Sequence, residues 1–267
     1  MADFETPDYE RRFGGVRRLY GELGLSKLHS AHVCVVGIGG VGSWAVEALA
    51  RSAVGHITLI DLDNIAESNV NRQLHAVDGA FGQAKVTAMA ERIHLINPAC
   101  QVHQIEEFIT PDNVAEMLNA GFDVVLDAID DAKAKVAIAA YCKQSKIPLI
   151  TTGGAGGRLD PTRIQSADLA QVSGDRLLAK VRNQLRRDHG FPKAPNAKKS
   201  PTKFGITAVY SDEPILQPET SCDTQTDAIT GLNCAGYGSS VCVTAPFGMA
   251  AAALVMQALL KHCNVKP

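Results

Sequence analysis

The sequence predicts an α/β fold of the Rossmann type, a doubly wound and mostly parallel sheet with helices on both faces. Two observations predict it. Short, almost continuous apolar runs, such as VCVV at 33–36 and DVVLD at 123–127, are typical of strands that are buried on both faces. These runs alternate with helical segments, and the first of them leads into a glycine-rich turn at 37–42. Such alternation favours right-handed βαβ crossovers.

The elements follow from apolar runs, Ala-rich periodic stretches and the prolines and glycines between them. We expect strands at 31–36, 56–60, 101–106, 122–127, 147–151 and 203–211, and helices at 40–53, 82–96, 111–119, 132–145 and 173–189. Pro246 fits an early position of a last helix that runs to about 262. We expect one domain over 1–267, with a nucleotide-binding core at 8–157 and a substrate-side extension at 158–267.

Composition narrows the class of protein. The chain has 267 residues, with 26 Lys and Arg against 28 Asp and Glu. This balance excludes a uniformly basic nucleic-acid binder, although a local basic patch remains compatible with it. The seven cysteines contain no Cys-x-x-Cys pair, which argues against a zinc ribbon and a disulfide framework. Because residues 1–10 lack the apolar core of a signal peptide, we expect a cytoplasmic protein.

The segment 241–260 is almost entirely apolar and long enough to span a bilayer. Pro246, Gly248 and Gln257 interrupt it. We therefore favour a buried core helix, with membrane association as the alternative.

The turn 37–42 has the pattern G-x-G-x-x-G between a strand and a helix. Glycines let a backbone approach a phosphate, and the following helix start offers unpaired N–H groups. This predicts phosphate binding by Gly37, Gly39, Gly40 and Gly42. Asp61 ends the next strand, where a carboxylate can accept hydrogen bonds from ribose hydroxyls. The pattern fits NAD as well as ATP, and helix–strand packing is the structural alternative.

Two cations favour ATP. Arg72 lies in SNVNRQ at 68–73, and Lys85 ends GQAK at 82–85. An enzyme that cleaves ATP must neutralise a triphosphate, whereas a dehydrogenase leaves its pyrophosphate intact. Asp130 follows the strand DVVLD, at the sheet edge where ligands bind, and could hold Mg²⁺. The structural alternative is that Asp130 or Asp131 caps the helix that starts near residue 132.

On GIGGVG, Asp61, SNVNRQ, GQAK and DAIDD (127–131), in this order and spacing, the chain resembles the ubiquitin-activating-enzyme-like adenylating enzymes. The resemblance implies an ATP–Mg²⁺ site lined by Gly40, Asp61, Asn69, Arg72, Lys85 and Asp130. It also implies a homodimer in which an N-terminal arginine reaches into the partner's site. Arg12 matches that arginine best, and Arg11 is the competing candidate.

Within this family the chain resembles the branch that dehydrates threonylcarbamoyladenosine in tRNA. RFGG at 12–15, LYG at 19–21, TTGGAGG at 151–157, DPT at 160–162 and DL at 168–169 carry this resemblance. It implies a carboxyl adenylate of the modified nucleoside and ring closure by its carbamoyl group. A tRNA substrate calls for a basic surface. Segment 176–203 holds nine cations and one acid, and we expect tRNA contacts from Arg182, Arg186, Arg187, Lys198 and Lys199.

Three alternatives stay open. The chain could adenylate the C-terminus of a ubiquitin-like sulfur-carrier protein, use NAD as an oxidoreductase, or act as a non-catalytic partner in a sulfur-relay or cysteine desulfurase system. Cys234 is a candidate nucleophile, and the structural alternative is that it is a small buried side chain. The carbonyls of 153–157 are a candidate site for a monovalent cation.

Overall fold

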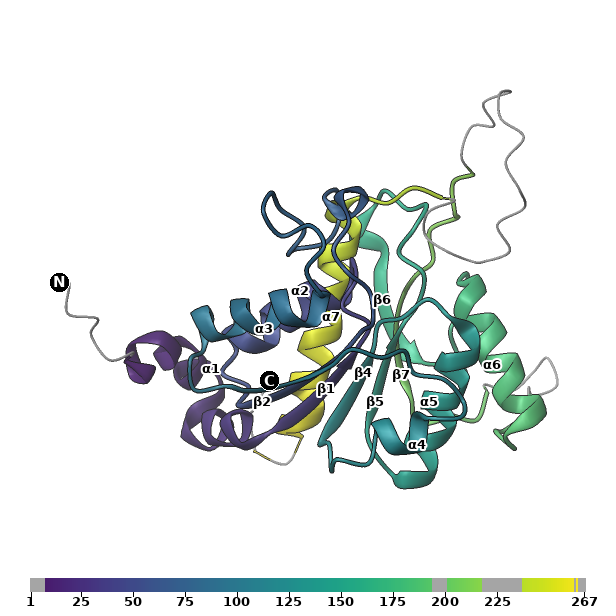
Figure 1. Ribbon diagram of the computed structural model, residues 1–267. Coiled ribbons are helices and arrows are strands. Elements are labelled where there is room, and N and C mark those ends of the chain that lie inside the picture. Colours follow the sequence, from purple (N-terminus) through teal and green to yellow (C-terminus); the bar gives the residue numbers. More distant parts are fainter. Residues whose placement is uncertain (1–7, 194–200, 218–236, 262, 264–267) are drawn as a thin grey trace.

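A computed structural model describes residues 8–193, 201–217, 237–261 and 263. Its centre is a seven-stranded sheet in the order β3-β2-β1-β4-β5-β7-β6 (Figure 1). The strands are β1 (His32–Val36), β2 (His56–Ile60), β3 (Gln101–Ile105), β4 (Val124–Asp127), β5 (Leu149–Thr152), β6 (Ile164–Asp168) and β7 (Thr207–Ser211). All neighbouring strands pair in parallel except β6, which is antiparallel to β7. The predicted Rossmann-like, mostly parallel sheet is confirmed.

Helices cover both faces of the sheet. They are α1 (Tyr9–Ser30), α2 (Gly42–Arg51), α3 (Lys85–Ile96), α4 (Val114–Met117), α5 (Ala132–Ser145), α6 (Arg176–Asp188) and α7 (Val241–Leu260), with 3-10 turns η1 (Glu67–Asn69) and η2 (Pro161–Arg163). One core cluster joins α2, α3 and α7 to one face, and a second joins α4, α5 and α6 to the other. The short strands β4 and β5 are buried along their whole length, as the apolar runs predicted.

The apolar helix α7 is a core element. By length and composition it could cross a membrane. In the structure it packs against α2 and the sheet (Figure 1). Its Val243, Phe247 and Val255 side chains are fully buried. Gly248 makes this packing possible, because a Cβ there would lie 2.4 Å from the carbonyl oxygen of Val41 and 2.8 Å from the Cβ of Trp44. The favoured interpretation of this segment therefore agrees with the packing.

Several boundaries and two elements differ from the expectation. No helix was predicted over the kinked α1, where Gly21 is non-helical with φ +75°, and only a few of its side chains, such as Phe13 and Leu25, are buried. Strand β6 was also missed, because its burial is incomplete and does not give a continuous apolar run. Helix α6 begins at Arg176 rather than near 173, since Asp175 caps it.

The sheet order places the topological switch point between β1 and β4. There the chain leaves β1 toward β2 on one side, and β4 leads toward β5 on the other. In open α/β sheets, ligands bind outside the carboxyl ends of the strands at such a point. The glycine turn follows β1 and residues 128–131 follow β4, so the fold brings these two sequence motifs together.

Candidate active site

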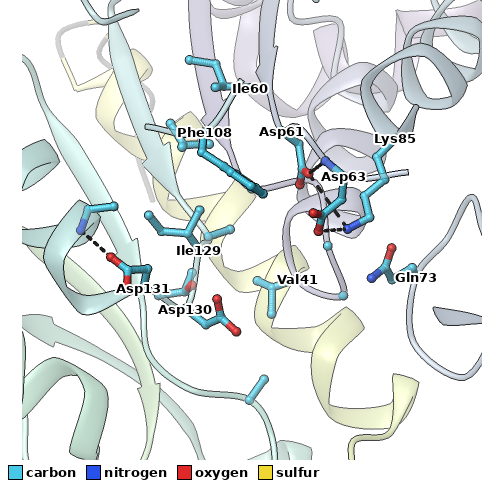
Figure 2. Close-up of a pocket in the computed structure, with 18 of the residues that line it drawn as sticks. Val41, Ile60, Asp61, Asp63, Gln73, Lys85, Phe108, Ile129, Asp130 and Asp131 are labelled. Atoms are coloured by element: carbon cyan, nitrogen blue, oxygen red, sulfur yellow. Dashed lines mark hydrogen bonds and ion pairs between the residues drawn. The ribbon is translucent and has the colours of Figure 1, made fainter. Parts of the chain in front are cut away.

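A cavity of about 660 Å³ lies at the switch point. Its walls come from the glycine turn, the ends of β2 and β4, the segment before α3, the loop after β3 and the loop after β5. Its lining includes Gly37, Gly39, Gly40, Asp61, Asp63, Asn69, Arg72, Gln73, Lys85, Phe108, Ile129, Asp130, Gly153, Gly154, Ser239 and Thr244. Figure 2 shows Phe108 and Ile129 on one side of this cavity and Lys85 with its acidic partners on the other.

The glycines of the turn divide into two roles. Gly37 has φ +87°, and a Cβ there would lie 2.8 Å from the side chain of Ile129. A Cβ on Gly42 would lie 1.8 Å from the carbonyl oxygen of Gly37. Gly42 does not line the cavity. Glycine is needed at this position for helix–strand packing, the structural alternative considered for the motif. Gly39 and Gly40 line the cavity and leave the backbone open to a ligand.

Asp61 fixes the turn from the end of β2. Its Oδ2 accepts the Ile38 amide at 2.6 Å, and its Oδ1 accepts the Asp63 amide at 2.9 Å. The side chain is buried, and this burial raises the pKa of Asp61, while Lys85 and the two amides oppose the rise. The carboxylate thus holds the backbone that forms the floor of the cavity.

Lys85 starts α3 and is 5% exposed. Its Nζ lies 2.7 Å from Oδ2 of Asp63 and 4.0 Å from Oδ1 of Asp61 (Figure 2). A buried ammonium needs such partners, because an isolated charge in the interior is costly. Lys85 is therefore aimed at the cavity by two carboxylates.

Arg72 is held by its own segment. Its Nη1 donates to the carbonyl of Ser68 at 2.8 Å and to Oδ1 of Asn71 at 3.0 Å. Its carbonyl accepts the indole N–H of Trp44 at 3.0 Å, which ties the segment to α2. The aliphatic part of the Arg72 side chain packs over the turn, since a Cβ on Gly40 would lie 3.2 Å from Cγ of Arg72.

The segment that carries Arg72 is also anchored to the start of α7. Nδ2 of Asn71 donates to the Ser239 carbonyl at 2.8 Å, and the Val241 amide donates to the Asn71 carbonyl at 3.2 Å. Asn69 is buried, lines the cavity and accepts the Ala66 amide on its Oδ1 at 3.0 Å. These contacts bring residues that are about 170 positions apart into one wall.

The two acids after β4 have different roles. Asp131 caps α5, because its Oδ1 accepts the Ala134 amide at 2.7 Å. Asp130 is exposed and lines the cavity (Figure 2). Capping, one of the two alternatives considered for this pair, therefore applies to Asp131, and Mg²⁺ binding by Asp130 stays a prediction. In the described residues no group of three or more His, Cys, Asp or Glu side chains could hold a metal by itself.

Arg12 lies outside the cavity of its own chain. Its Nη1 donates to the carbonyls of Leu95 and Ile96, at 3.1 and 2.7 Å, at the end of α3. It lines a second hollow with Arg51 and Arg92. Within one protomer, therefore, Arg12 is not brought together with Arg72 and Lys85.

The predicted RNA-binding residues lie on α6 and beyond it. Arg187 is exposed and paired with Asp188, while Arg182 donates to the carbonyl of Val172 and is partly buried. The guanidinium of Arg186 lies 5.4 Å from the ring centre of Phe204. Arg182 and Arg186 therefore also contribute to the packing of this helix against its neighbours. Lys198 and Lys199 lie outside the described residues.

Two further predictions touch the loop after β5 and the cysteines. The Gly154 carbonyl accepts a hydrogen bond from Nε of Arg158 at 2.8 Å, and the Gly157 carbonyl accepts one from the Leu216 amide at 2.8 Å. These two carbonyls therefore already have partners, and the monovalent cation at this loop stays a prediction. Cys234 lies outside the described residues. Burial raises the pKa of Cys100 and of Cys142 to about 12, which keeps these thiols protonated and unreactive.

Sequence reasoning missed several lining residues. Asp63 sits two positions after Asp61, and its carboxylate orients Lys85. Gln73 lines the cavity, and its buried Oε1 has no partner in the described residues. Phe108 also lines the cavity, and its large apolar side chain is 52% exposed. It lies in a loop that contains no recognisable motif. Gln73 lay within the quoted SNVNRQ, whereas nothing in the sequence signals Phe108.

Comparison with known proteins places this cavity in a family context. The model of the ThiF family matches residues 9–267. The tRNA threonylcarbamoyladenosine dehydratase of Haemophilus influenzae is 50% identical over 255 residues, covering 95% of each chain. Crystal structures of the Escherichia coli tRNA N6-threonylcarbamoyladenosine dehydratase in complex with AMP and with ATP are each 45% identical to this chain, with a TM-score of 0.85. The first covers 97% of this chain and 98% of its own, and the second 98% and 99%. The chain therefore belongs to the ThiF family.

Proposed function

We propose that the chain is an ATP-dependent enzyme that dehydrates threonylcarbamoyladenosine in the tRNA anticodon loop through a carboxyl adenylate. The observation that carries the proposal is the gathering of Arg72, Lys85 and Asp130 around one glycine-lined cavity at the switch point. The Haemophilus influenzae relative, named for this dehydration, matches along nearly the whole chain. An ATP-bound structure of the Escherichia coli relative supports ATP as the co-substrate.

The chemistry explains why ATP is needed. A carboxylate is a poor acyl donor, because oxide is a bad leaving group. Its oxygen attacks the α-phosphorus of ATP, the bond to the bridging oxygen breaks, and pyrophosphate leaves with the electron pair. The neighbouring carbamoyl group then attacks the acyl carbon, loses a proton and expels AMP. The ring is then closed, and the modified nucleoside has lost one water overall. Well-oriented intramolecular attacks reach effective molarities of roughly 10⁵ M or more, so ring closure requires no protein nucleophile.

The chain's own share is positioning and charge neutralisation. Lys85, oriented by Asp63, and Arg72, which packs over Gly40, supply positive charge beside the open backbone of Gly39 and Gly40. Such charge stabilises a triphosphate most in the transition state, when negative charge moves onto the leaving pyrophosphate. Asp61 keeps the turn in place and lines the same cavity, where its carboxylate could also accept hydrogen bonds from ribose hydroxyls.

Mg²⁺ fits the exposed carboxylate of Asp130. This ion commonly takes one or two carboxylates together with phosphate oxygens and waters, so a single lining acid suffices. Asp130 is free of the capping bond that occupies Asp131. When bound, Mg²⁺ would neutralise phosphate charge; Asp130 would hold it on the β4 side of the cavity, across from Lys85.

Two partners belong to the proposal. The first is a second copy of the chain, whose Arg12 would complete the cavity, since Arg12 lies outside the cavity of its own protomer. The second is tRNA, held by the basic segment 176–203. Because tRNA is the substrate, the cytoplasm is the proposed location.

The test is mass spectrometry of tRNA nucleosides. The purified protein is incubated with ATP, Mg²⁺ and tRNA that carries threonylcarbamoyladenosine. We expect this nucleoside to be replaced by a product lighter by one water, with release of AMP and pyrophosphate. A reaction without ATP and one with Lys85→Met serve as controls. Unchanged tRNA with wild-type protein and ATP would contradict the proposal.

A parallel reaction tests the carrier-protein alternative. It replaces tRNA with a small protein that ends in Gly-Gly, and measures exchange of labelled pyrophosphate into ATP. We expect exchange only with modified tRNA. Exchange that requires the Gly-Gly protein would favour a sulfur-carrier adenylating enzyme.

A further inference from the structure

A buried ion pair lies behind the loop that follows β5. The Arg158 side chain is fully buried, and its Nη2 lies 3.0 Å from Oδ2 of Asp175. Nε of Arg158 donates to the Gly154 carbonyl at 2.8 Å, and the Gly154 amide donates to Oδ2 of Asp175 at 3.0 Å. One ion pair therefore satisfies both backbone polar groups of Gly154, a residue that lines the cavity.

Gly153 shows how closely the pair approaches this loop. A Cβ on Gly153 would lie 2.3 Å from Oδ2 of Asp175, so any larger residue must displace either the carboxylate or the loop. The other bonds of Arg158 go to the carbonyls of Ser211 and Glu213, which extend from the end of β7. The guanidinium thus connects the cavity loop to the sheet.

The same carboxylate begins α6. Oδ1 of Asp175 accepts the Leu178 amide at 2.9 Å and caps the helix. Arg176, Lys180 and Arg187 are exposed along this helix, at positions that share one face. Asp175 is therefore bonded at one oxygen to the proposed RNA-binding helix and at the other to the cavity loop.

We propose that the Arg158–Asp175 ion pair is a positioning device that sets Gly153–Gly154 at the cavity according to the placement of α6, so that docking of RNA on α6 orders the cavity loop. The inference rests on the proposed function for the identity of the docking ligand. A bound RNA phosphate backbone restrains α6, its cap holds Asp175, and Asp175 with Arg158 holds both polar groups of Gly154. Neither Arg158 nor Asp175 lines the cavity, so they act through the loop.

The test compares Asp175→Asn with a matched control, Asp168→Asn. Asp168 accepts three amides, of Ala170, Phe204 and Gly205, at 2.8–2.9 Å, and it does not line the cavity. Both variants remove one carboxylate charge that binds backbone amides in the same region of the chain. We expect Asp175→Asn to lower kcat by about 10- to 100-fold at saturating ATP and tRNA, because small misplacement of a reacting group costs that much. The KM for tRNA should stay within about threefold, and Asp168→Asn should keep kcat.

Hydrogen exchange measures the coupling directly and does not depend on turnover. In the wild-type protein, added tRNA should slow amide exchange in peptides covering 153–157 and 176–188. In Asp175→Asn it should still protect 176–188 but no longer 153–157. Equal protection of both segments in the variant, or an unchanged kcat, would overturn the inference.

Gly153→Ala is a second variant that should interrupt the connection between α6 and the cavity loop, because its Cβ displaces the loop while both charges of the ion pair remain. It should also reduce kcat and uncouple the two segments. If Asp175→Asn fails to fold, this variant decides, and wild-type kcat and coupling in it would overturn the inference. If wild-type protein neither binds nor converts tRNA, the proposed function fails instead. The positioning role is then judged by exchange of 153–157 with ATP alone, which Asp175→Asn or Gly153→Ala should accelerate and Asp168→Asn should not.

Discussion

At the scale of single residues, Lys85 shows how a charge is prepared for a ligand. Its ammonium is buried between two carboxylates, 2.7 Å from Asp63 and 4.0 Å from Asp61. A side chain held in this way loses little freedom when a phosphate arrives, because its rotamer is already set.

We predict that Lys85→Met lowers ATP-dependent dehydration of tRNA by about 10²- to 10³-fold, the usual loss for one preorganised charge on a transition state. Methionine keeps most of the volume, so the change isolates the charge. The measurement is the initial rate of AMP release at saturating tRNA.

Lys143→Met makes the same chemical change at a lysine that donates to the Phe204 carbonyl and does not line the cavity. It should keep the wild-type rate. Comparable loss in both variants would show that the effect comes from stability rather than from the cavity.

His75 is a second buried residue with a measurable consequence. It is 5% exposed, and neither ring nitrogen has a hydrogen-bond partner in the part of the chain that the structure describes. Burial lowers the pKa of His75 to about 4, and the positive charge of Lys85 adds to the lowering. In the unfolded chain the pKa is about 6.5. Between pH 6.5 and 4 the unfolded state therefore binds more protons than the folded state.

It follows that His75 makes the protein less stable as the pH falls through this window. The shift corresponds to about 3 kcal/mol of unfolding free energy by pH 4. We predict that His75→Leu loses about 3 kcal/mol less than wild type between pH 7 and pH 4, measured by urea unfolding. Parallel curves for the two proteins would mean that the pKa of His75 is the same in the folded and unfolded states.

At the scale of elements, α6 combines packing with an exposed charged face. Leu178, Val181 and Leu185 are buried, whereas Lys180 and Arg187 point to solvent. The charge count of segment 176–203 identified the helix but not its faces. The structure separates Arg182 and Arg186, which also contact Val172 and Phe204, from the exposed cations.

We predict that Arg187→Ala weakens tRNA binding and reduces the slope of log Kd against log salt concentration by about 1, the change expected for one lost phosphate contact. Binding is measured by filter retention across a salt series. Lys27→Ala removes a surface cation from α1, where it pairs with Asp123, and should leave the slope unchanged. A wild-type affinity that does not respond to salt would contradict the RNA surface.

The elements also show what sequence could and could not provide. Strands β1, β2, β4 and β5 were predictable because burial on both faces leaves continuous apolar runs. Strand β6 is partly exposed and pairs with β7 from a distant part of the chain, so its sequence carries little signal. The cap Asp175 was missed for a related reason. Its role depends on Arg158, and pairing between distant polar residues leaves no periodic pattern.

At the scale of the whole molecule, the proposed function assigns Arg12 of a second copy of the chain to each site. Arg12 lies at the end of α3 of its own protomer, outside the cavity. We predict that Arg12→Ala and Lys85→Met are each inactive as pure proteins. After mixed refolding, half of the dimers should contain one site with all groups, which restores about a quarter of wild-type activity.

Mixing each variant with additional copies of itself is the control and should restore nothing. Absence of activity in the mixture, with both variants folded and dimeric, would place Arg12 outside the catalytic centre.

The anchoring of Arg72 by the start of α7 also determines when the site can form. Asn71 bonds to Ser239 and Val241, and the hydroxyl of Thr244 donates to the Arg72 carbonyl at 3.4 Å. On the ribosome, residues 37–131 emerge long before these partners do. A nascent chain released before about residue 245 would carry every phosphate-binding motif and still lack one wall of its pocket. Nucleotide affinity should therefore be acquired late in translation, as the last helix closes onto the oldest part of the polypeptide.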